Sequence, residues 1–139
     1  MATVIRPEIS TKNKYYIDKH RYYELKHFCL QYLSWKRAYR ALEELGATSS
    51  MINHTPSGST HSDLTAKYAI RKAHYLERIE LIENTAKEAD CDLHTYILKA
   101  VTEGLSFTYL KSRLEIPCGR DMYYDRYRRF FWLLSNSRN

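Results

Sequence analysis

Apolar residues recur at helical spacing along most of the chain, and the alternation typical of β-strands does not persist anywhere. From Leu25 to Leu42 they follow one another at steps of three and four, the rhythm of a helix packed lengthwise against another helix. This pattern begins near Lys14 and ends at Gly46, and Ser34 leaves room for a break into two helices. The sequence therefore predicts an all-α fold.

A second long helix is predicted after residues 47–61, which are rich in Ser, Thr, Asn, Pro and Gly and favour a loop. Ser62 offers an N-cap, and helical spacing of apolar residues continues from there to Ala89. The small side chains of Ala69 and Ala73 would let this helix approach the aromatic residues of the preceding one. The two helices should form a long antiparallel hairpin.

Three segments follow from these patterns. Residues 1–13 lack a helical period and are expected to form a flexible arm. Residues 14–89 should form the hairpin, with its loop at residues 47–61. Residues 90–139 should form a separate C-terminal domain of three helices.

The C-terminal domain has the order of a helix-turn-helix unit. Residues 92–102 form its first predicted helix, and residues 106–114 form a short second helix. Pro117 cannot continue that helix, and Gly119 is expected to take a positive φ in the turn. A helix, a tight turn and a basic helix beginning near residue 120 are typical of DNA-binding proteins.

The last predicted helix has an apolar side and a basic side. Its apolar residues recur at steps of four, three and four and should face the core: Tyr123, Tyr127, Phe130 and Leu134. The basic side and its flanks carry the residues predicted to contact nucleic acid: Arg120, Tyr124, Arg126, Arg128 and Arg129. A guanidinium can bond a phosphate or a guanine edge through two hydrogen bonds, which a lysine cannot do with the same geometry. Replacing Arg126 and Arg129 should leave the fold intact, because neither lies on the apolar side.

Residues 109–116, followed by residues 123–131, resemble the C-terminal helix-turn-helix of small phage transcriptional regulators of the RinA and ArpU type. The shared features are a leucine-isoleucine helix, a turn, a pair of tyrosines, alternating basic residues and a closing apolar pair. The turn here is longer than in those regulators. The resemblance implies a fold similar to region four of sigma factors and double-stranded DNA as partner. Lys111 and Arg113 complete the predicted contact set.

The charge of the chain is unevenly distributed. The formal net charge is +6, with about +4 at each end and about −2 between residues 61 and 104. Basic ends favour a polyanionic partner, which agrees with the predicted DNA contact.

No catalytic, cofactor or metal site is predicted. The chain has no glycine-rich phosphate loop and no Gly-x-Ser-x-Gly elbow, so we expect no enzyme activity and no cofactor. The three cysteines and six histidines are scattered and show no metal-ligand spacing. No targeting segment or membrane span is visible, so the expected location is the cytoplasm.

Three functions fit these observations. The first is a phage or mobile-element transcription regulator whose hairpin forms a homodimer or contacts RNA polymerase. The second is a phage-encoded inhibitor of the anti-CRISPR kind, which binds a host protein or ribonucleoprotein such as a nuclease complex. The third is a scaffolding protein with a solvated basic face. The regulator requires the four arginines of the last helix to share an exposed surface with Tyr124. It is contradicted if these residues are held in intramolecular pairs with Asp121, Asp125 or the acidic helix in the middle of the chain. The inhibitor requires an exposed aromatic patch, formed by Trp132 with Phe131 or by Tyr15, Tyr16, Tyr22 and Tyr23.

Overall fold

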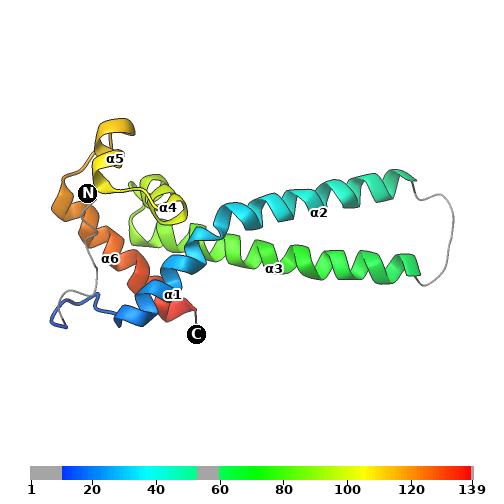
Figure 1. Cartoon of the computed structure of the whole chain (residues 1–139), viewed down its shortest axis with the longest axis horizontal. Helices are drawn as coiled ribbons and strands as arrows, with labels where there is room; N and C mark the ends of the chain where they lie inside the picture. The colour runs from blue at the N-terminus through cyan, green and yellow to red at the C-terminus, as the bar shows by residue number, and fades with distance from the viewer. Residues whose placement is uncertain (1–10, 53–59, 139) are drawn as a thin grey trace. The chain divides into compact units, whose positions relative to one another are not determined.

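The computed structural model describes residues 11–52 and 60–138, and every regular element in these residues is a helix. Within them the chain forms six helices (Figure 1): α1 (Lys19–Leu30), α2 (Tyr32–Ile52), α3 (Thr60–Ala89), α4 (His94–Glu103), α5 (Phe107–Arg113) and α6 (Arg120–Ser137). The predicted all-α fold is confirmed.

The helices belong to two compact units. The first unit contains the described residues up to Gln31 and those from Leu81 onwards, and the second unit contains Tyr32–Glu80. This division differs from the predicted domains, because α1 packs against α4 and α6 in the first unit. The boundary between the units lies inside α3, between Glu80 and Leu81, whereas the predicted boundary after residue 89 coincides with the end of α3.

The N-terminal helical pattern contains two helices. Asp18 caps α1, since its carboxylate accepts a hydrogen bond of 3.0 Å from the backbone N–H of His20, and α1 therefore starts later than the predicted start near Lys14. The break between α1 and α2 falls at Gln31, before the predicted position at Ser34. Most of the predicted arm, residues 1–10, lies outside the described residues.

In the second unit, α2 and α3 lie side by side (Figure 1). The helix α2 continues through Gly46, where the sequence predicted its end, because one glycine costs a helix only about 1 kcal/mol. The helix α3 begins at Thr60, ahead of the predicted cap at Ser62. Of the predicted loop, residues 53–59 lie outside the described residues.

Long basic side chains of α3 cover aromatic rings of α2. The ammonium of Lys72 lies 5.2 Å from the ring centroid of Tyr39, and the guanidinium of Arg78 lies 5.5 Å from that of Trp35. These pairs run in opposite directions along the two helices, so the helices are antiparallel. Two of the alanines predicted to face the preceding helix are exposed, Ala69 and Ala73, whereas Ala86, further along the same pattern, is buried in the first unit.

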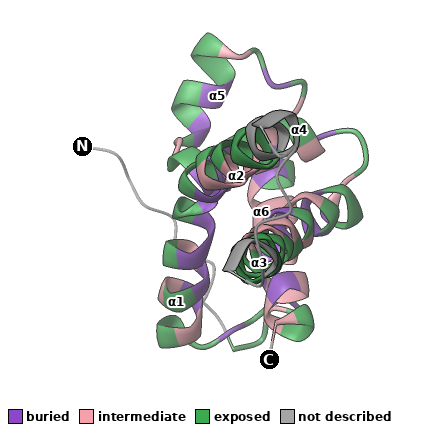
Figure 2. Ribbon diagram, turned by 90° about the vertical axis from the view of Figure 1, so that its right-hand side faces the viewer, coloured by how far each residue is buried: buried purple, intermediate pink, exposed green. Residues whose placement is uncertain are grey.

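The core of the first unit lies among α1, α4, α6 and the last turns of α3. Its buried positions lie on the sides of α1, α5 and α6 that face their neighbours (Figure 2). Fully buried side chains include Tyr22, Leu25, Ile82, Ile97, Leu110, Phe130 and Phe131. The predicted apolar side of the last helix is confirmed at Tyr123, Phe130 and Leu134, whereas Tyr127 is half-buried and Phe131 joins the core.

Candidate nucleic-acid interface

The short helix α5 presents one apolar side and one basic side. Ser106 caps it as predicted, with its Oγ accepting a 3.2 Å hydrogen bond from the N–H of Tyr109. Phe107 and Leu110 are buried. Lys111 is exposed, as is Arg113, and Arg113 makes no ion pair or hydrogen bond with any described residue.

The turn between α5 and α6 is anchored by a buried isoleucine. Ile116 is 1% exposed, and its N–H donates a 3.1 Å hydrogen bond to the carbonyl of Leu110. The positive φ lies at Glu115, with a value of 54°. The predicted role of Gly119 is therefore wrong, because that residue is extended, with φ −83° and ψ 173°. The reversal occurs directly after α5, so the chain approaches α6 in an extended form.

Lys111 closes this turn. Its ammonium lies 3.3 Å from the carbonyl oxygens of both Ile116 and Cys118, and it donates to them. These contacts hold its positive charge close to the first turn of α6, where Gly119 offers no side-chain cap. The N-terminus of a helix carries a partial positive charge, so the charge of Lys111 adds to it.

Arg126 is part of an ion-pair network and is not free to contact DNA. Its Nε lies 2.8 Å from Oδ2 of Asp90, and its Nη1 lies 2.6 Å from Oδ2 of Asp125. The other oxygen of Asp90 accepts hydrogen bonds from the backbone N–H groups of Asp92 and Leu93, at 2.8 and 2.9 Å. The network therefore joins α6 to the segment between α3 and α4.

The ionisation of Asp90 reflects this network. Burial alone would raise the pKa of Asp90, but the hydrogen bonds from the Leu93 N–H, the Arg126 guanidinium and the Asp92 N–H outweigh it. The pKa of Asp90 is therefore lowered. The carboxylate stays ionised beside Arg126 at neutral pH, which keeps the guanidinium occupied.

Arg129 also has a structural role. Its Nη1 donates to the hydroxyl of Tyr15 at 3.3 Å, and its Nη2 donates to the carbonyl of Glu88 at 3.5 Å. The hydrogen bond from Arg129 is the main reason why the pKa of Tyr15 is lowered. Tyr15 is buried, and its ring packs against Trp132 with centroids 5.7 Å apart. Arg126 and Arg129 are not among the buried residues of α6, but both make contacts within the first unit, so we now expect their replacement to lower its stability.

Three other predicted residues form a stripe along α6. Arg120, Tyr124 and Arg128 are spaced four residues apart, so they lie on one side of the helix. The guanidinium of Arg120 lies 5.4 Å from the ring centroid of Phe107, and the rings of Tyr124 and Phe107 are 6.2 Å apart. Arg128 is half-buried and makes no ion pair or hydrogen bond with any described residue. We call these three residues the α6 stripe.

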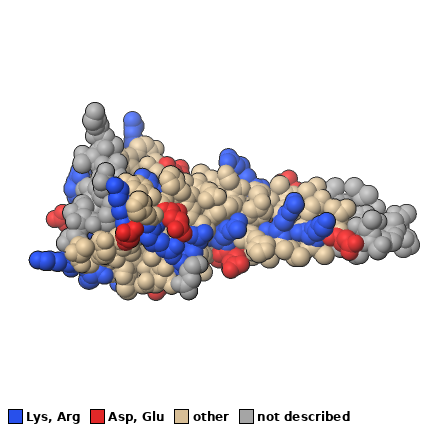
Figure 3. Space-filling view, turned by 60° about the horizontal axis from the view of Figure 1, so that its bottom comes forward, with Lys and Arg blue, Asp and Glu red and all other residues tan. Residues whose placement is uncertain are grey.

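Four basic residues define the α5–α6 basic surface: Lys111, Arg113, Arg120 and Arg128. Two acids lie on the neighbouring side of α6, the exposed Asp121 and the half-buried Asp125, which is paired with Arg126. Basic and acidic side chains are interspersed over the face drawn in Figure 3. The α5–α6 basic surface therefore has acidic side chains next to it on α6.

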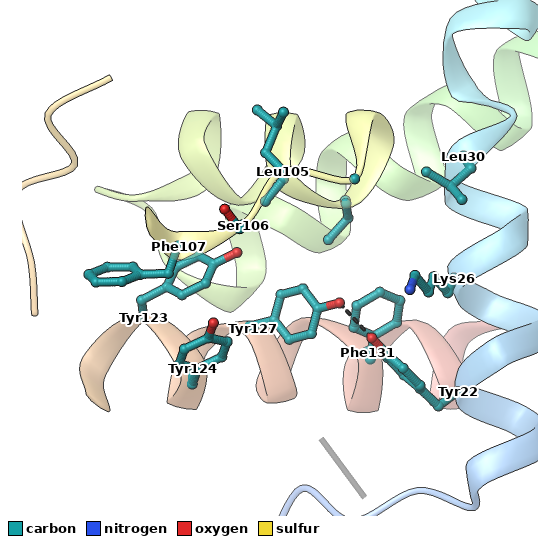
Figure 4. A pocket seen from close by; sticks show the side chains of 13 residues that line it. Tyr22, Lys26, Leu30, Leu105, Ser106, Phe107, Tyr123, Tyr124, Tyr127 and Phe131 are labelled. Carbon is teal, nitrogen blue, oxygen red and sulfur yellow. Dashed lines mark hydrogen bonds between the residues drawn. The ribbon is translucent and has the colours of Figure 1, made fainter. Parts of the chain in front are cut away.

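A pocket lined mainly by aromatic rings lies beside α6 (Figure 4). It has a volume of about 130 Å³ and is lined from α1, from the end of α4 and start of α5, and from α6. Within it the hydroxyls of Tyr22 and Tyr127 share a 2.7 Å hydrogen bond. The sequence analysis missed this pocket, because its residues come from helices far apart in the chain.

The described residues contain neither a metal-binding cluster nor a membrane-spanning helix. These residues hold no group of three or more His, Cys, Asp or Glu side chains that could bind a metal ion. Cys29, Cys91 and Cys118 are free thiols, and burial raises the pKa of Cys29 above its ordinary range. None of the helices in this part of the chain is long and apolar enough to cross a membrane.

Comparison with known proteins adds no further assignment. The chain has no significant match among models of protein families, curated proteins or solved structures. Its function must therefore be inferred from its own residues. The requirement set for a DNA-binding regulator is not met as a whole. Arg120 is exposed, but Tyr124 and Arg128 are half-buried on the same side of α6. Arg126 is paired with Asp90 and Asp125, and Arg129 is hydrogen-bonded within the first unit.

Proposed function

We propose that this protein binds double-stranded DNA and regulates transcription, with α6 as the helix that enters the major groove. The observation that carries the proposal is the α6 stripe, in which two arginines that form no ion pair with any described residue flank a tyrosine on the first half of α6. The recognition helix of a helix-turn-helix protein contacts base edges with its N-terminal residues. Arg120, Tyr124 and Arg128 occupy that part of α6.

The α5–α6 turn supports the same proposal. Lys111 and Arg113 lie on α5, and the contacts of Lys111 with the turn hold its charge near the start of α6. Phosphate contacts from basic side chains position a protein on the duplex, whereas base contacts supply specificity. We assign Lys111 and Arg113 to phosphates, and Arg120 and Arg128 to phosphates or guanine edges.

In this proposal the fold is a helical hairpin, α2 with α3, joined to a helix-turn-helix formed by α4, α5 and α6. The resemblance of residues 109–116 and 123–131 to phage regulators of the RinA and ArpU type supports it. The ion pairs of Arg126 and the hydrogen bonds of Arg129 would hold α6 in place, and neither arginine would contact DNA. The hairpin would serve a homodimer or a contact with RNA polymerase in the cytoplasm.

The inhibitor hypothesis has less support. It required an exposed aromatic patch, yet three of the six residues predicted for the patch lie in the core. Tyr15 is 7% exposed, Tyr22 is 1% exposed and Phe131 is fully buried. We therefore do not propose that function.

The proposal is tested by fluorescence anisotropy of a labelled mixed-sequence duplex titrated with the protein. We expect binding at about 50 mM salt that weakens steeply by about 200 mM, because binding releases counterions from the DNA phosphates. With three or four phosphate contacts, the slope of log K against log salt should be roughly −3 to −4. A duplex that does not bind at either salt concentration would contradict the proposal.

A further inference from the structure

The pocket beside α6 has the size of one aromatic ring. Its volume is about 130 Å³. An engineered apolar cavity of about 150 Å³ in another protein is known to hold benzene. The walls include the rings of Tyr22, Phe107, Tyr123, Tyr127 and Phe131. Aromatic rings prefer edge-to-face or offset contacts with one another, so these walls favour a flat aromatic guest.

The backbone shapes the pocket on the side opposite α6. Gly104 ends α4 in the left-handed conformation, with φ 70° and ψ 36°. This allows the chain to turn sharply into Leu105 and Ser106, which also line the pocket. The pocket is therefore built from fixed helix ends and packed rings of a single compact unit.

Among the described residues, one cation and no acidic side chain line the pocket. Lys26 of α1 is half-exposed and makes no ion pair or hydrogen bond with any described residue. It belongs to the α1 side of the pocket, as do Tyr22 and Leu30 (Figure 4). The hydroxyl groups of Tyr22 and Tyr127, which also line the pocket, form a hydrogen bond with each other. This bond fixes the positions of both hydroxyl groups. An anionic group on the guest would neutralise the charge of Lys26.

We propose that this pocket binds a small aromatic carboxylate, with its ring among the tyrosines and Phe131 and its carboxylate facing Lys26. The proposal does not depend on DNA binding, because the ring and the carboxylate of the ligand would be held by pocket residues whether or not α6 contacts DNA. The bound ring would contact Tyr124, which belongs to the α6 stripe. Such a ligand would therefore lie directly beside the proposed DNA-reading helix.

Isothermal titration calorimetry with benzoate tests the proposal on the full chain. We expect saturable binding of one benzoate per protein, with a dissociation constant between about 10 µM and 1 mM for a ligand of this size. Acetate has the charge without the ring, and benzyl alcohol has the ring without the charge. Each should bind at least about tenfold more weakly than benzoate.

Variants at Lys26 separate this site from unspecific binding. Lys26→Gln should weaken benzoate binding by about tenfold, and Lys26→Glu should abolish it and create binding of benzylammonium. The matched control is Lys19→Gln, an exposed lysine of the same helix outside the pocket, which should bind benzoate like the wild type. Circular dichroism checks that the variants are folded.

Three results would overturn the proposal. They are the absence of saturable benzoate binding up to about 10 mM, equal binding of benzoate and acetate, and unchanged binding in Lys26→Gln. The titration contains no DNA, so failure here leaves the proposed DNA contact intact, and failure of duplex binding leaves this site intact.

Discussion

At the scale of single residues, the arginines of α6 serve two purposes. Arg126 bridges Asp90 and Asp125, and Arg129 joins Tyr15 to the backbone of Glu88. A planar guanidinium with five donors suits such bridges, because it can bond several acceptors at once. The same chemistry suits phosphate, so residue type alone does not distinguish a structural arginine from one that contacts DNA.

Replacing Arg126 by Ala should lower the free energy of unfolding by about 1 to 2 kcal/mol at neutral pH. This value lies between those of exposed and buried ion pairs, because the Arg126 side chain is 33% exposed and that of Asp90 is 10% exposed. Urea denaturation of the variant and the wild type measures the difference. Arg113→Ala, at an exposed position of α5, is the control and should change stability by less than about 0.5 kcal/mol.

The effect of Arg126→Ala should depend on pH. Because the pKa of Asp90 is lowered in the folded state, its ionised form stabilises the fold above its unfolded pKa of about 3.9, and this stabilisation is lost as the pH falls through the folded pKa. The difference between variant and wild type should therefore be largest at neutral pH and shrink below about pH 4. A difference that stays constant down to low pH would show that the lost stability comes from packing and not from the pair.

At the scale of elements, the α5–α6 turn sets where α6 begins. The sequence was sufficient to predict the cap at Ser106 and the break before α6, because capping and proline effects are local. It was not sufficient to predict the positive φ at Glu115, since intrinsic preference favours glycine there. The turn takes this form because Ile116 is buried and its N–H bonds to Leu110.

Replacing Ile116 by Ala should therefore lower stability by about 2 to 4 kcal/mol, through lost burial and the cavity left in the core. Thermal or urea denaturation followed by circular dichroism measures the loss. Leu64→Ala, at a leucine of α3 that is 47% exposed, is the matched apolar control and should cost much less. Equal losses at the two positions would contradict the anchoring role of Ile116.

At the scale of the whole molecule, the sequence predicted helices but not how they are shared between units. Helical periodicity shows which side of a helix is apolar, but it does not identify the partner of that side. The assignment of α1 to the first unit depends on contacts such as the one between Tyr22 and Tyr127, which are 105 residues apart in the chain. Likewise, the sequence did not reveal the ion pair between Arg126 and Asp90, because the two residues lie 36 positions apart in the chain. Such pairings are properties of the folded chain.

The proposed DNA contacts all lie on α5 and α6, in the first unit. The second unit also has exposed basic side chains without partners among the described residues, which include Arg40, Lys67 and Arg71. A chain that bound DNA only through its net charge would use both sets. Removing the charges of one set or of the other therefore distinguishes binding through a specific surface from general electrostatic attraction.

The most direct test compares the salt dependence of duplex binding for two matched triple variants. The first variant, on α5 and α6, combines Arg113→Gln, Arg120→Gln and Arg128→Gln. The second variant, on α2 and α3, combines Arg40→Gln, Lys67→Gln and Arg71→Gln. Each removes the same charge, and fluorescence anisotropy gives the slope of log K against log salt. The first variant should lose most affinity and flatten the slope by roughly three units, about one for each lost phosphate contact. The second should bind like the wild type. Equal losses in both variants, or no loss in the first, would contradict the proposed DNA-binding surface on α5 and α6.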